Sequence, residues 1–449
     1  MSNLIRQLQH KAAGKFSQPA DANYKSAIRI FNSAIDTRPE AVLHCQSAQD
    51  VVLGVNLARD LNIGLSVRGG GHNSAGLALR GGGGLMLDTS GWRKVVADPL
   101  TRRARSAPGA TWADYDAVTQ LHKLGSPGGV VSSTGVFGLT MSGGIGALRA
   151  RHGLACDNVR SFEIVLADGS TVTADADRHP DLFWAVRGGG SNFGILTEME
   201  FEIHPVDRVV TGMLVWPLAQ AMSVFEHYAK IAPTLTDNCV VDFFLARFPQ
   251  SPPTLVAVPR YIGTMAQGLT ELEPLRRFGS PQDNLAEMSY CDSQKFLDPV
   301  TVWDLRQLWR TQTLRELDLG AMNVLVEFFA RAPSPMSMFT IEHLKGGVHR
   351  VGATDTAVGF RGATMNLMLT AQWVDPADDA VNQAWIRELG EAVSRFPAIG
   401  AYANYLPQDA DASDVQRAYG VNHVRLQAVK AAYDANNFFR CNQNILPHR

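Results

Sequence analysis

The stretch from Ser66 to Gly76, SVRGGGHNSAG, constrains this chain more than any other. Residues 64–67 resemble the end of a short buried strand, and three glycines and a histidine follow almost at once. Successive residues without Cβ let the backbone take positive φ and approach a bound group closely. Consecutive free N–H groups in such a turn can bind a phosphate group. Arg68 adds a positive charge at the edge of the turn. The stretch is therefore either a plain turn or part of a ligand site.

The residues after this turn disfavour a dinucleotide-binding Rossmann fold. That fold needs a helix directly after its glycines, because the helix N-terminus holds the pyrophosphate. Here a short apolar stretch, four glycines at 81–84 and the strand-like run 85–88 come next instead. No helical periodicity fits between Asn73 and Asp88, so we expect a different nucleotide fold.

Composition excludes several classes of protein. The 41 basic and 43 acidic residues give a net charge of −2, without the basic excess that nucleic acids or anionic membranes attract. No apolar run approaches the roughly 20 residues that span a bilayer, and we expect no signal peptide. The five cysteines are odd in number and lack CxxC spacing, which argues against a disulfide framework and a zinc site. The expected location is a reducing cytoplasm.

Two further glycine-rich stretches lie downstream, at 128–146 and 187–195. The first is long and apolar, and is either a buried loop packed on a sheet or a wrap around a flat ligand. Structureless loops beyond about 12 to 15 residues are usually functional or disordered. This one is too apolar for disorder, so a wrap around a ligand is favoured.

After about Asp207 glycine becomes less frequent, and longer expected strands alternate with amphipathic helices. This pattern predicts an antiparallel sheet with helices on one face. Near residue 405 the pattern of the N-terminal region returns, with a helix expected from a cap at Ser413 to about Tyr433. The expected strands of the middle region are 211–216, 240–248, 255–262, 321–330 and 363–373, and its expected helices are 219–232, 265–278 and 378–396.

Together and in this order, these stretches resemble the vanillyl-alcohol-oxidase superfamily of flavoproteins, and more closely its berberine-bridge-enzyme-like branch of FAD-linked oxidases. The match covers both ends of the chain, and the middle matches loosely. The matching stretches are SVRGGGHNSAG (66–76), STGVFGLTMSGGIGALRARHGLACDN (133–158), LADGS (166–170), DLFWAVRGGGSNFGI (181–195), YANYL (402–406) and YDANNFFRCNQNI (433–445).

The resemblance implies an α+β fold with a two-part FAD-binding domain of the PCMH type. Its N-terminal part would span residues 1–206, with a core at about 36–206. A substrate domain at 207–404, an antiparallel sheet backed by helices, would follow. Residues 405–449 would return to the FAD-binding domain.

In that family the histidine after the glycines bonds covalently to the 8α-methyl group of FAD, and His72 stands at that position. Without this context His72 would be a satisfied core or surface histidine, and a metal role is not expected because no second ligand stands at suitable spacing. The residues implied to bind the cofactor are His72, Arg68, Gly69, Gly70, Gly71, Asn73, Ser133, Thr134, Gly135, Gly138, Ser142, Gly143, Gly146, Gly194, Ile195, Asn442 and Asn444.

Many members tether FAD a second time, through a cysteine just before the turn that Gly135 matches. Val131 occupies that position here, and Cys156 lies well downstream. Because valine cannot form a thioether, we expect one covalent bond through His72 and no cysteinyl bond.

In that family substrate hydride passes to flavin N5 while a base takes the hydroxyl proton. A tyrosine ending a Tyr-x-Asn-Tyr pattern is that base in several members, and Tyr405 matches it. A phenol with a pKa of about 10 must be lowered by positive charge or hydrogen bonds to act near neutrality. The alternative for Tyr405 is a structural hydrogen bond, and Gln372 is a second candidate for the substrate pocket.

The implied function is an FAD-dependent oxidoreductase that oxidises an alcohol, sugar or natural-product substrate by hydride transfer to covalently bound flavin. Its expected partners are a small-molecule substrate and O2 as acceptor, with no nucleic acid and no membrane. Two alternatives stay open: a flavin dehydrogenase with another electron acceptor, and a non-catalytic binding protein on the same scaffold. The oligomeric state and the substrate are not fixed by these residues.

Overall fold

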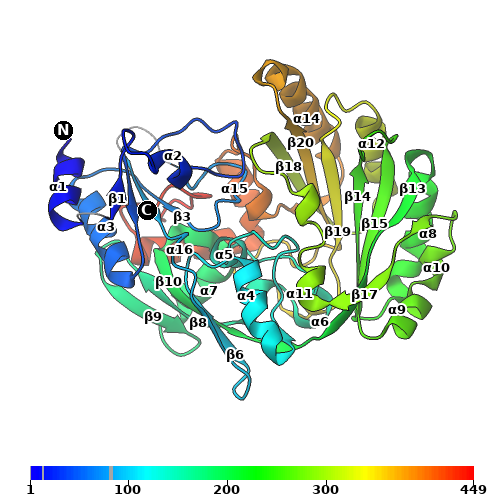
Figure 1. Ribbon diagram of the computed structural model, residues 1–449, viewed down its shortest axis with the longest axis horizontal. Helices are drawn as coiled ribbons and strands as arrows, with labels where there is room; N and C mark the ends of the chain where they lie inside the picture. The colour runs from blue at the N-terminus through cyan, green and yellow to red at the C-terminus, as the bar shows by residue number, and fades with distance from the viewer. Residues whose placement is uncertain (1, 13–14, 80–83, 449) are drawn as a thin grey trace.

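The computed structural model describes residues 2–12, 15–79 and 84–448, so glycines 81–83 of the expected second glycine run lie outside it. Figure 1 shows two halves set side by side, with the large sheet of β13 to β20 forming one of them. The other half combines the N-terminal elements, among them β3 (Leu65–Arg68), with the red C-terminal end, where α16 (His423–Tyr433) shares a hydrophobic core with β10 (Ile195–Glu202). Both ends of the chain therefore build one half.

The first half contains a two-stranded pair, β7 (Leu124–Gly125) with β11 (His204–Pro205), and two larger sheets. One has the order β1-β2-β4-β3, and its strands β2, β4 and β3 run parallel. The other has the order β5-β6-β10-β8-β9 and is antiparallel throughout. The strands are β1 (Phe16–Ser17), β2 (Ala41–His44), β4 (Leu85–Asp88), β5 (Val95–Asp98), β6 (Arg103–Ser106), β8 (Val159–Val165) and β9 (Thr171–Asp175).

Capping explains where the helices of this half begin. The side chain of Ser47 accepts from the Asp50 N–H at the start of α3, and Thr111 and Asp114 form a capping box at the start of α4. The helices are α1 (Asn3–Lys11), α2 (Tyr24–Ala27), α3 (Ala48–Asp60), α4 (Trp112–Thr119), α5 (Val136–Met141), α6 (Arg149–His152), α7 (Pro180–Gly189), α15 (Ala412–Tyr419) and α16.

Two expectations for this half are wrong. The helix expected from Ser413 to Tyr433 is two helices, α15 capped by Asp411 and then α16, because Gly420 takes a φ of 51° and breaks the run. The stretch 128–146 is not structureless, since it contains α5, which buries Val136, Phe137 and Thr140 on one side.

The second half is built on one antiparallel sheet with the order β16-β13-β15-β14-β19-β20-β18-β21, to which β12 and β17 add through β15. Helices α8, α12 and α14 share a hydrophobic core with one face of this sheet. The elements are β12 (Arg208–Thr211), β13 (Leu214–Pro217), α8 (Ala221–Ile231), β14 (Cys239–Ala246), β15 (Thr254–Ile262), α9 (Met265–Glu271), α10 (Glu273–Arg276), β16 (Gln282–Asp283), β17 (Ala286–Ser289), α11 (Tyr290–Ser293), β18 (Arg306–Leu314), α12 (Leu319–Ala330), β19 (Met338–His343), α13 (Gly347–Arg350), β20 (Met365–Trp373), α14 (Asp379–Val393) and β21 (Ala398–Gly400).

The strand expected at 321–330 is wrong, because these residues form helix α12. Its buried residues are Ala321, Met322, Leu325, Phe328 and Phe329, which is the spacing of one helical face. Asp318 caps the helix by accepting from the Ala321 N–H. The run is rich in valine and phenylalanine, which favour strands, but its periodicity is helical.

Strand alternation gives the large sheet two different faces. On β14 and β19, Phe243, Leu245, Phe339 and Ile341 belong to the core shared with the helices. Their neighbours on the same strands line a cavity on the opposite face: Asp242, Phe244, Met338, Thr340 and Glu342. In the described ranges, no helix combines the length and the apolar character that crossing a membrane requires.

Candidate functional site

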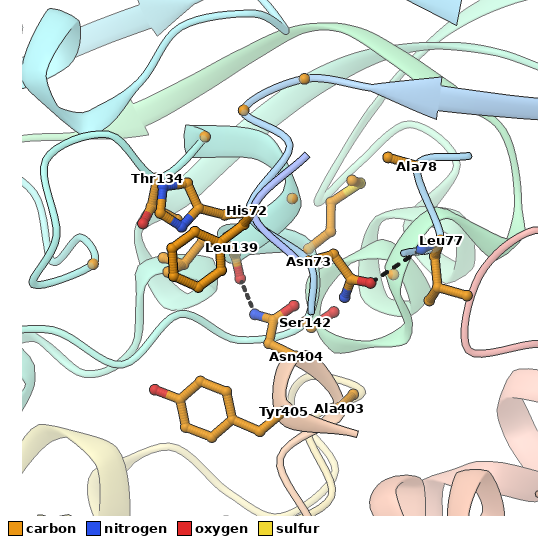
Figure 2. A pocket seen from close by; sticks show the side chains of 18 of the residues that line it. His72, Asn73, Leu77, Ala78, Thr134, Leu139, Ser142, Ala403, Asn404 and Tyr405 are labelled. Atoms are coloured by element: carbon orange, nitrogen blue, oxygen red, sulfur yellow. Dashed lines mark hydrogen bonds between the residues drawn. The ribbon is translucent and has the colours of Figure 1, made fainter. Parts of the chain in front are cut away.

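A cavity of about 350 Å³ lies where the glycine-rich stretches of the first half face the large sheet of the second. Its size is within the range of ligand pockets. Figure 2 shows His72 and Thr134 on one side of this cavity and Tyr405 on the other. Asn404 ties the two sides together, since its Nδ2 donates to the carbonyl oxygen of Leu139 at 3.0 Å.

The first two glycine stretches meet backbone to backbone. A Cβ added to Gly70 would lie 2.4 Å from the backbone nitrogen of Gly135, and one added to Gly135 would lie 2.7 Å from the nitrogen of Gly70. Only glycine allows this approach. A Cβ added to Gly138 would meet nothing within 4 Å. Gly138 therefore borders open space, as the wall around a flat ligand would.

His72 is fixed in place on three sides. Its Nε2 lies 2.8 Å from Ser133 Oγ. Its ring centroid lies 4.7 Å from that of Phe31, on which it stacks, and 4.9 Å from that of Trp303, with which it forms an edge-to-face pair. Burial lowers the pKa of His72 to about 4. The ring is therefore neutral at neutral pH and keeps a nitrogen lone pair, which bond formation to carbon requires.

Most of the candidate site residues meet in this cavity. Those that line it are Gly69, Gly70, Gly71, His72, Asn73, Thr134, Gly135, Gly138, Ser142, Gly194, Ile195, Asn442, Gln372 and Tyr405. Ser133 stands just behind His72, and Arg68, Gly143, Gly146 and Asn444 are also outside the lining.

The residues outside the lining have other contacts. Arg68 donates to the carbonyl oxygen of Arg29 at 3.1 Å and to Asp88 Oδ1 at 3.2 Å, so its charge stabilises the end of β3. A Cβ on Gly146 would lie 1.6 Å from the carbonyl oxygen of Gly128, so this glycine is required by the packing of two chain segments.

The C-terminal tail carries amide atoms without partners. Asn442 Oδ1, Gln443 Nε2 and Asn444 Oδ1 are buried, and within the part of the chain that is described they make no hydrogen bond. Asn442 and Gln443 line the cavity. Since buried polar groups are nearly always paired, these atoms indicate a ligand with polar edges. The polar edge of an isoalloxazine ring has suitable donors and acceptors, so the residues fit FAD.

Tyr405 faces a carboxyl group that the sequence-based reasoning missed. Its hydroxyl donates to Glu342 Oε1 at 3.2 Å, and Asn366 Nδ2 donates to Glu342 Oε2 at 2.5 Å. Burial raises the pKa of Glu342 to about 7, and the charge of Asp242 adds to the effect. A glutamate inside the apolar strand run MFTIEH was the signal available, because buried strands seldom carry one.

The pKa of Tyr405 moves in the direction opposite to the one expected for a base. Burial raises it well above the usual value for a phenol, and the neighbouring Glu342 raises it further. Glu342, with a pKa of about 7, is therefore the group of this pair that titrates near neutrality.

A buried ion-pair network lies beside this pair. Asp242 stands opposite Glu342 in the register of β14 and β19. Its carboxylate pairs with Arg149, and it accepts from Arg260 Nη1 at 2.7 Å. Arg149 also donates to the carbonyl oxygen of His343 at 2.8 Å, which joins α6 of the first half to the large sheet.

The remaining candidates lie at the far end of the cavity and on its glycine side. Gln372 Nε2 donates to Gln307 Oε1 at 3.3 Å. Val131, which stands where many relatives have the cysteine of the second FAD bond, is part of the lining. Because valine has no thiol, this position cannot form a thioether. Cys441 also lines the cavity, and its Sγ donates to the carbonyl oxygen of Leu77 at 3.0 Å.

Comparison with known proteins gives two family matches. The FAD binding domain family matches residues 39–175, and the family described as berberine and berberine like matches residues 401–446. The FAD-linked oxidoreductase YgaK of Bacillus subtilis, uncharacterized, is 28% identical over 98% of both chains. The (R)-6-hydroxynicotine oxidase of Paenarthrobacter nicotinovorans is 26% identical over 97% of both. The crystal structure of 6-hydroxy-D-nicotine oxidase from Arthrobacter nicotinovorans matches with a TM-score of 0.88 and 25% identity, over 97% of this chain and 98% of that one.

The fold, the glycine-lined cavity and these matches define the class: the protein is an FAD-linked oxidoreductase. Within that class the chain combines an FAD binding domain with a segment of the berberine and berberine like family, and so resembles the berberine-bridge-enzyme-like oxidoreductases. The family resemblance, the α+β fold class and the enzyme class expected from the sequence are confirmed.

Proposed function

We propose that the protein oxidises a small-molecule alcohol to a carbonyl compound, with FAD bound covalently through His72 and O2 as the final electron acceptor. The observation that carries this proposal is that the hydrogen-bonded pair Tyr405 and Glu342 opens onto the same cavity as His72. The relative that is an oxidase by name supports the choice of O2.

Oxidation of an alcohol to a carbonyl removes one hydride and one proton, and FAD when bound supplies the hydride acceptor. The chain must take the proton. The hydroxyl of Tyr405 receives it from the substrate as its own proton passes to Glu342 Oε1, 3.2 Å away. This relay needs no free tyrosinate, so it agrees with the raised pKa of Tyr405. It replaces the hypothesis that Tyr405 alone is the base.

The neutral imidazole of His72 is suited to form the bond to FAD. Ser133 holds Nε2 and Phe31 holds the plane of the ring, so the ring presents Nδ1 as its remaining nitrogen. Val131 excludes a thioether at the second position. One covalent bond is therefore the proposed mode of attachment.

The purified protein tests the proposal in two steps. Acid precipitation separates covalent from dissociable flavin, and yellow colour in the pellet supports the bond to His72. An anaerobic screen of alcohols, sugars and phenols for loss of the flavin colour, followed by admission of air, then tests catalysis and the acceptor. Reduction that air does not reverse would point to a dehydrogenase, and a colourless protein would contradict the proposal.

A further inference from the structure

The floor of the cavity is one face of β14, β19, β20 and β18, and strand register orders its residues in rows. In the row nearest Tyr405, Asp242 on β14 stands opposite Glu342 on β19. The row at the far end contains Gln372, opposite Gln307. Between them lie two rows, the first with Phe244, Thr340 and Met368, and the second with Met338, Thr370 and Trp309. The floor therefore has polar ends and a middle that is mostly apolar.

The two middle rows suit a flat apolar body. Phe244 and Trp309 offer aromatic surfaces, and Met338 and Met368 offer flexible, polarizable ones. Leu297 and Val131 add further apolar side chains to the lining. An aromatic ring placed here would exchange water for contact with these side chains, which is the main source of binding free energy for apolar ligands.

The middle rows offer few free hydrogen-bonding groups. Thr370 Oγ1 already donates to the carbonyl oxygen of Met338 at 2.6 Å. Thr340 Oγ1 is buried and, among the described residues, has no partner. A sugar carries a hydroxyl group on nearly every carbon. Burying each of these hydroxyl groups costs binding free energy unless it forms a hydrogen bond in the site. The middle of this floor can form a hydrogen bond with one such hydroxyl group, through Thr340, so it disfavours carbohydrates.

The charges of the cavity favour a neutral substrate. In the described part of the chain, the lining contains neither lysine nor arginine, so a carboxylate substrate would lack a counter-ion. The carboxylate of Asp242 is already paired with Arg149 and Arg260. With Glu342 ionised, these four groups sum to zero charge, so an ammonium group gains no net attraction either.

We propose that the substrate is a neutral aromatic alcohol, with its ring over Phe244, Met338 and Trp309 and its hydroxyl at Tyr405. The hydroxyl of Thr340 pairs with a single polar substituent on the ring. This inference rests on the proposed function: the carbinol carbon loses its hydride to FAD, its hydroxyl proton goes through Tyr405 to Glu342, and the product is the aryl aldehyde or ketone.

The test uses the holoenzyme and two readouts, perturbation of the flavin spectrum on anaerobic titration and loss of flavin colour. The panel contains a series of aryl carbinols, hexoses and disaccharides, aryl carboxylates, and aryl amines. We expect the carbinols to bind and reduce the flavin, and the sugars and carboxylates to do neither. Stronger binding or faster reduction by a sugar, an acid or an amine would overturn the substrate class while leaving the oxidoreductase proposal standing. If nothing reduces the flavin, the proposed function fails, and the binding titration still decides the substrate class.

Two variants locate the substrate on the floor. Phe244→Ala should raise the Kd of every bound carbinol by about two- to tenfold, because the contact between the two aromatic rings is lost. Thr340→Val should weaken carbinols with a polar ring substituent and leave unsubstituted ones unchanged. Thr311→Val is the matched control, because its Oγ1 is likewise buried without a partner among the described residues but Thr311 is not part of the cavity lining. Equal selectivity in wild type and Thr340→Val would overturn the role of Thr340, and an unchanged Kd in Phe244→Ala would overturn the placement of the ring.

Discussion

The hydroxyl of Tyr405 lies 3.2 Å from Glu342 Oε1, and both residues line the cavity that also contains His72. One member of this pair comes from the C-terminal motif and the other from the middle of the large sheet. The relationship gives the tyrosine a proton acceptor whose pKa is about 7. This hydrogen-bonded pair therefore predicts how the rate of flavin reduction depends on pH, and which variants should change that rate.

Glu342→Gln should slow flavin reduction and remove its pH dependence near neutrality. Because burial raises the pKa of Glu342 to about 7, the carboxylate that accepts the proton forms only as the pH rises through that value. In the wild type, the rate of reduction should therefore increase from about pH 6 to about pH 8, by about tenfold per pH unit at the acidic end. Stopped-flow measurement of the reductive half-reaction checks this. The same pH profile in the variant would show that another group accepts the proton.

Tyr405→Phe should slow flavin reduction by about 10²–10⁴-fold, which is the usual contribution of a positioned acid or base. The ring and its edge contacts with Trp309 and Tyr402 are kept, so folding and FAD content should barely change. Reoxidation by O2 should be unaffected, because the reduced flavin no longer needs a group that accepts the substrate proton. Reduction at the wild-type rate would make the tyrosine structural and leave Gln372 to be considered.

His72→Ala should abolish covalent flavin and keep loosely bound FAD, since the glycine wall around Gly70 and Gly135 is unchanged. Gel filtration after denaturation measures the bound fraction. Ser133→Ala is the companion variant: it removes the hydroxyl that lies 2.8 Å from His72 Nε2 and should slow attachment without preventing it. Release of all flavin from the denatured wild type would refute the covalent bond.

Peptide mapping should find flavin on the His72 peptide alone. Val131 provides no sulfur at the second position, and Cys441 is the other residue to inspect, because it lines the cavity. Mass spectrometry of a proteolytic digest distinguishes the two. A flavin adduct on the Cys441 peptide would disprove the expectation of a single bond.

The sequence predicted the parts of the site that depend on local chemistry. The sequence pattern singled out Gly70 and Gly135 as residues beside a bound group, and the structure brings both to the cavity wall. Their binding of FAD and the covalent bond through His72 stay predictions. The domain boundaries at residues 206 and 404 stay predictions.

The features that the sequence did not predict depend on distant contacts. Glu342 meets Tyr405 only because β19 lies in the sheet opposite the return of the C-terminal segment, 63 residues further along the chain. The raised pKa of Tyr405 comes from that burial and is opposite to the direction expected for a base. Residues 321–330 are not a strand because the helical spacing of Met322, Leu325 and Phe329 outweighs the strand preference of the single residues.

Arg149→Met should destabilise the protein more than any surface charge variant. Its guanidinium is fully buried and pairs with Asp242, and it also donates to the carbonyl oxygens of Gly146 and His343. Removing one partner of a buried ion pair costs about 3–5 kcal/mol, because the other charge stays buried. Arg331→Met is the matched control, since its pair with Glu388 is exposed and such pairs contribute about 0–1 kcal/mol. Urea unfolding of both variants measures the difference, and equal losses would show that Asp242 is satisfied by Arg260 alone.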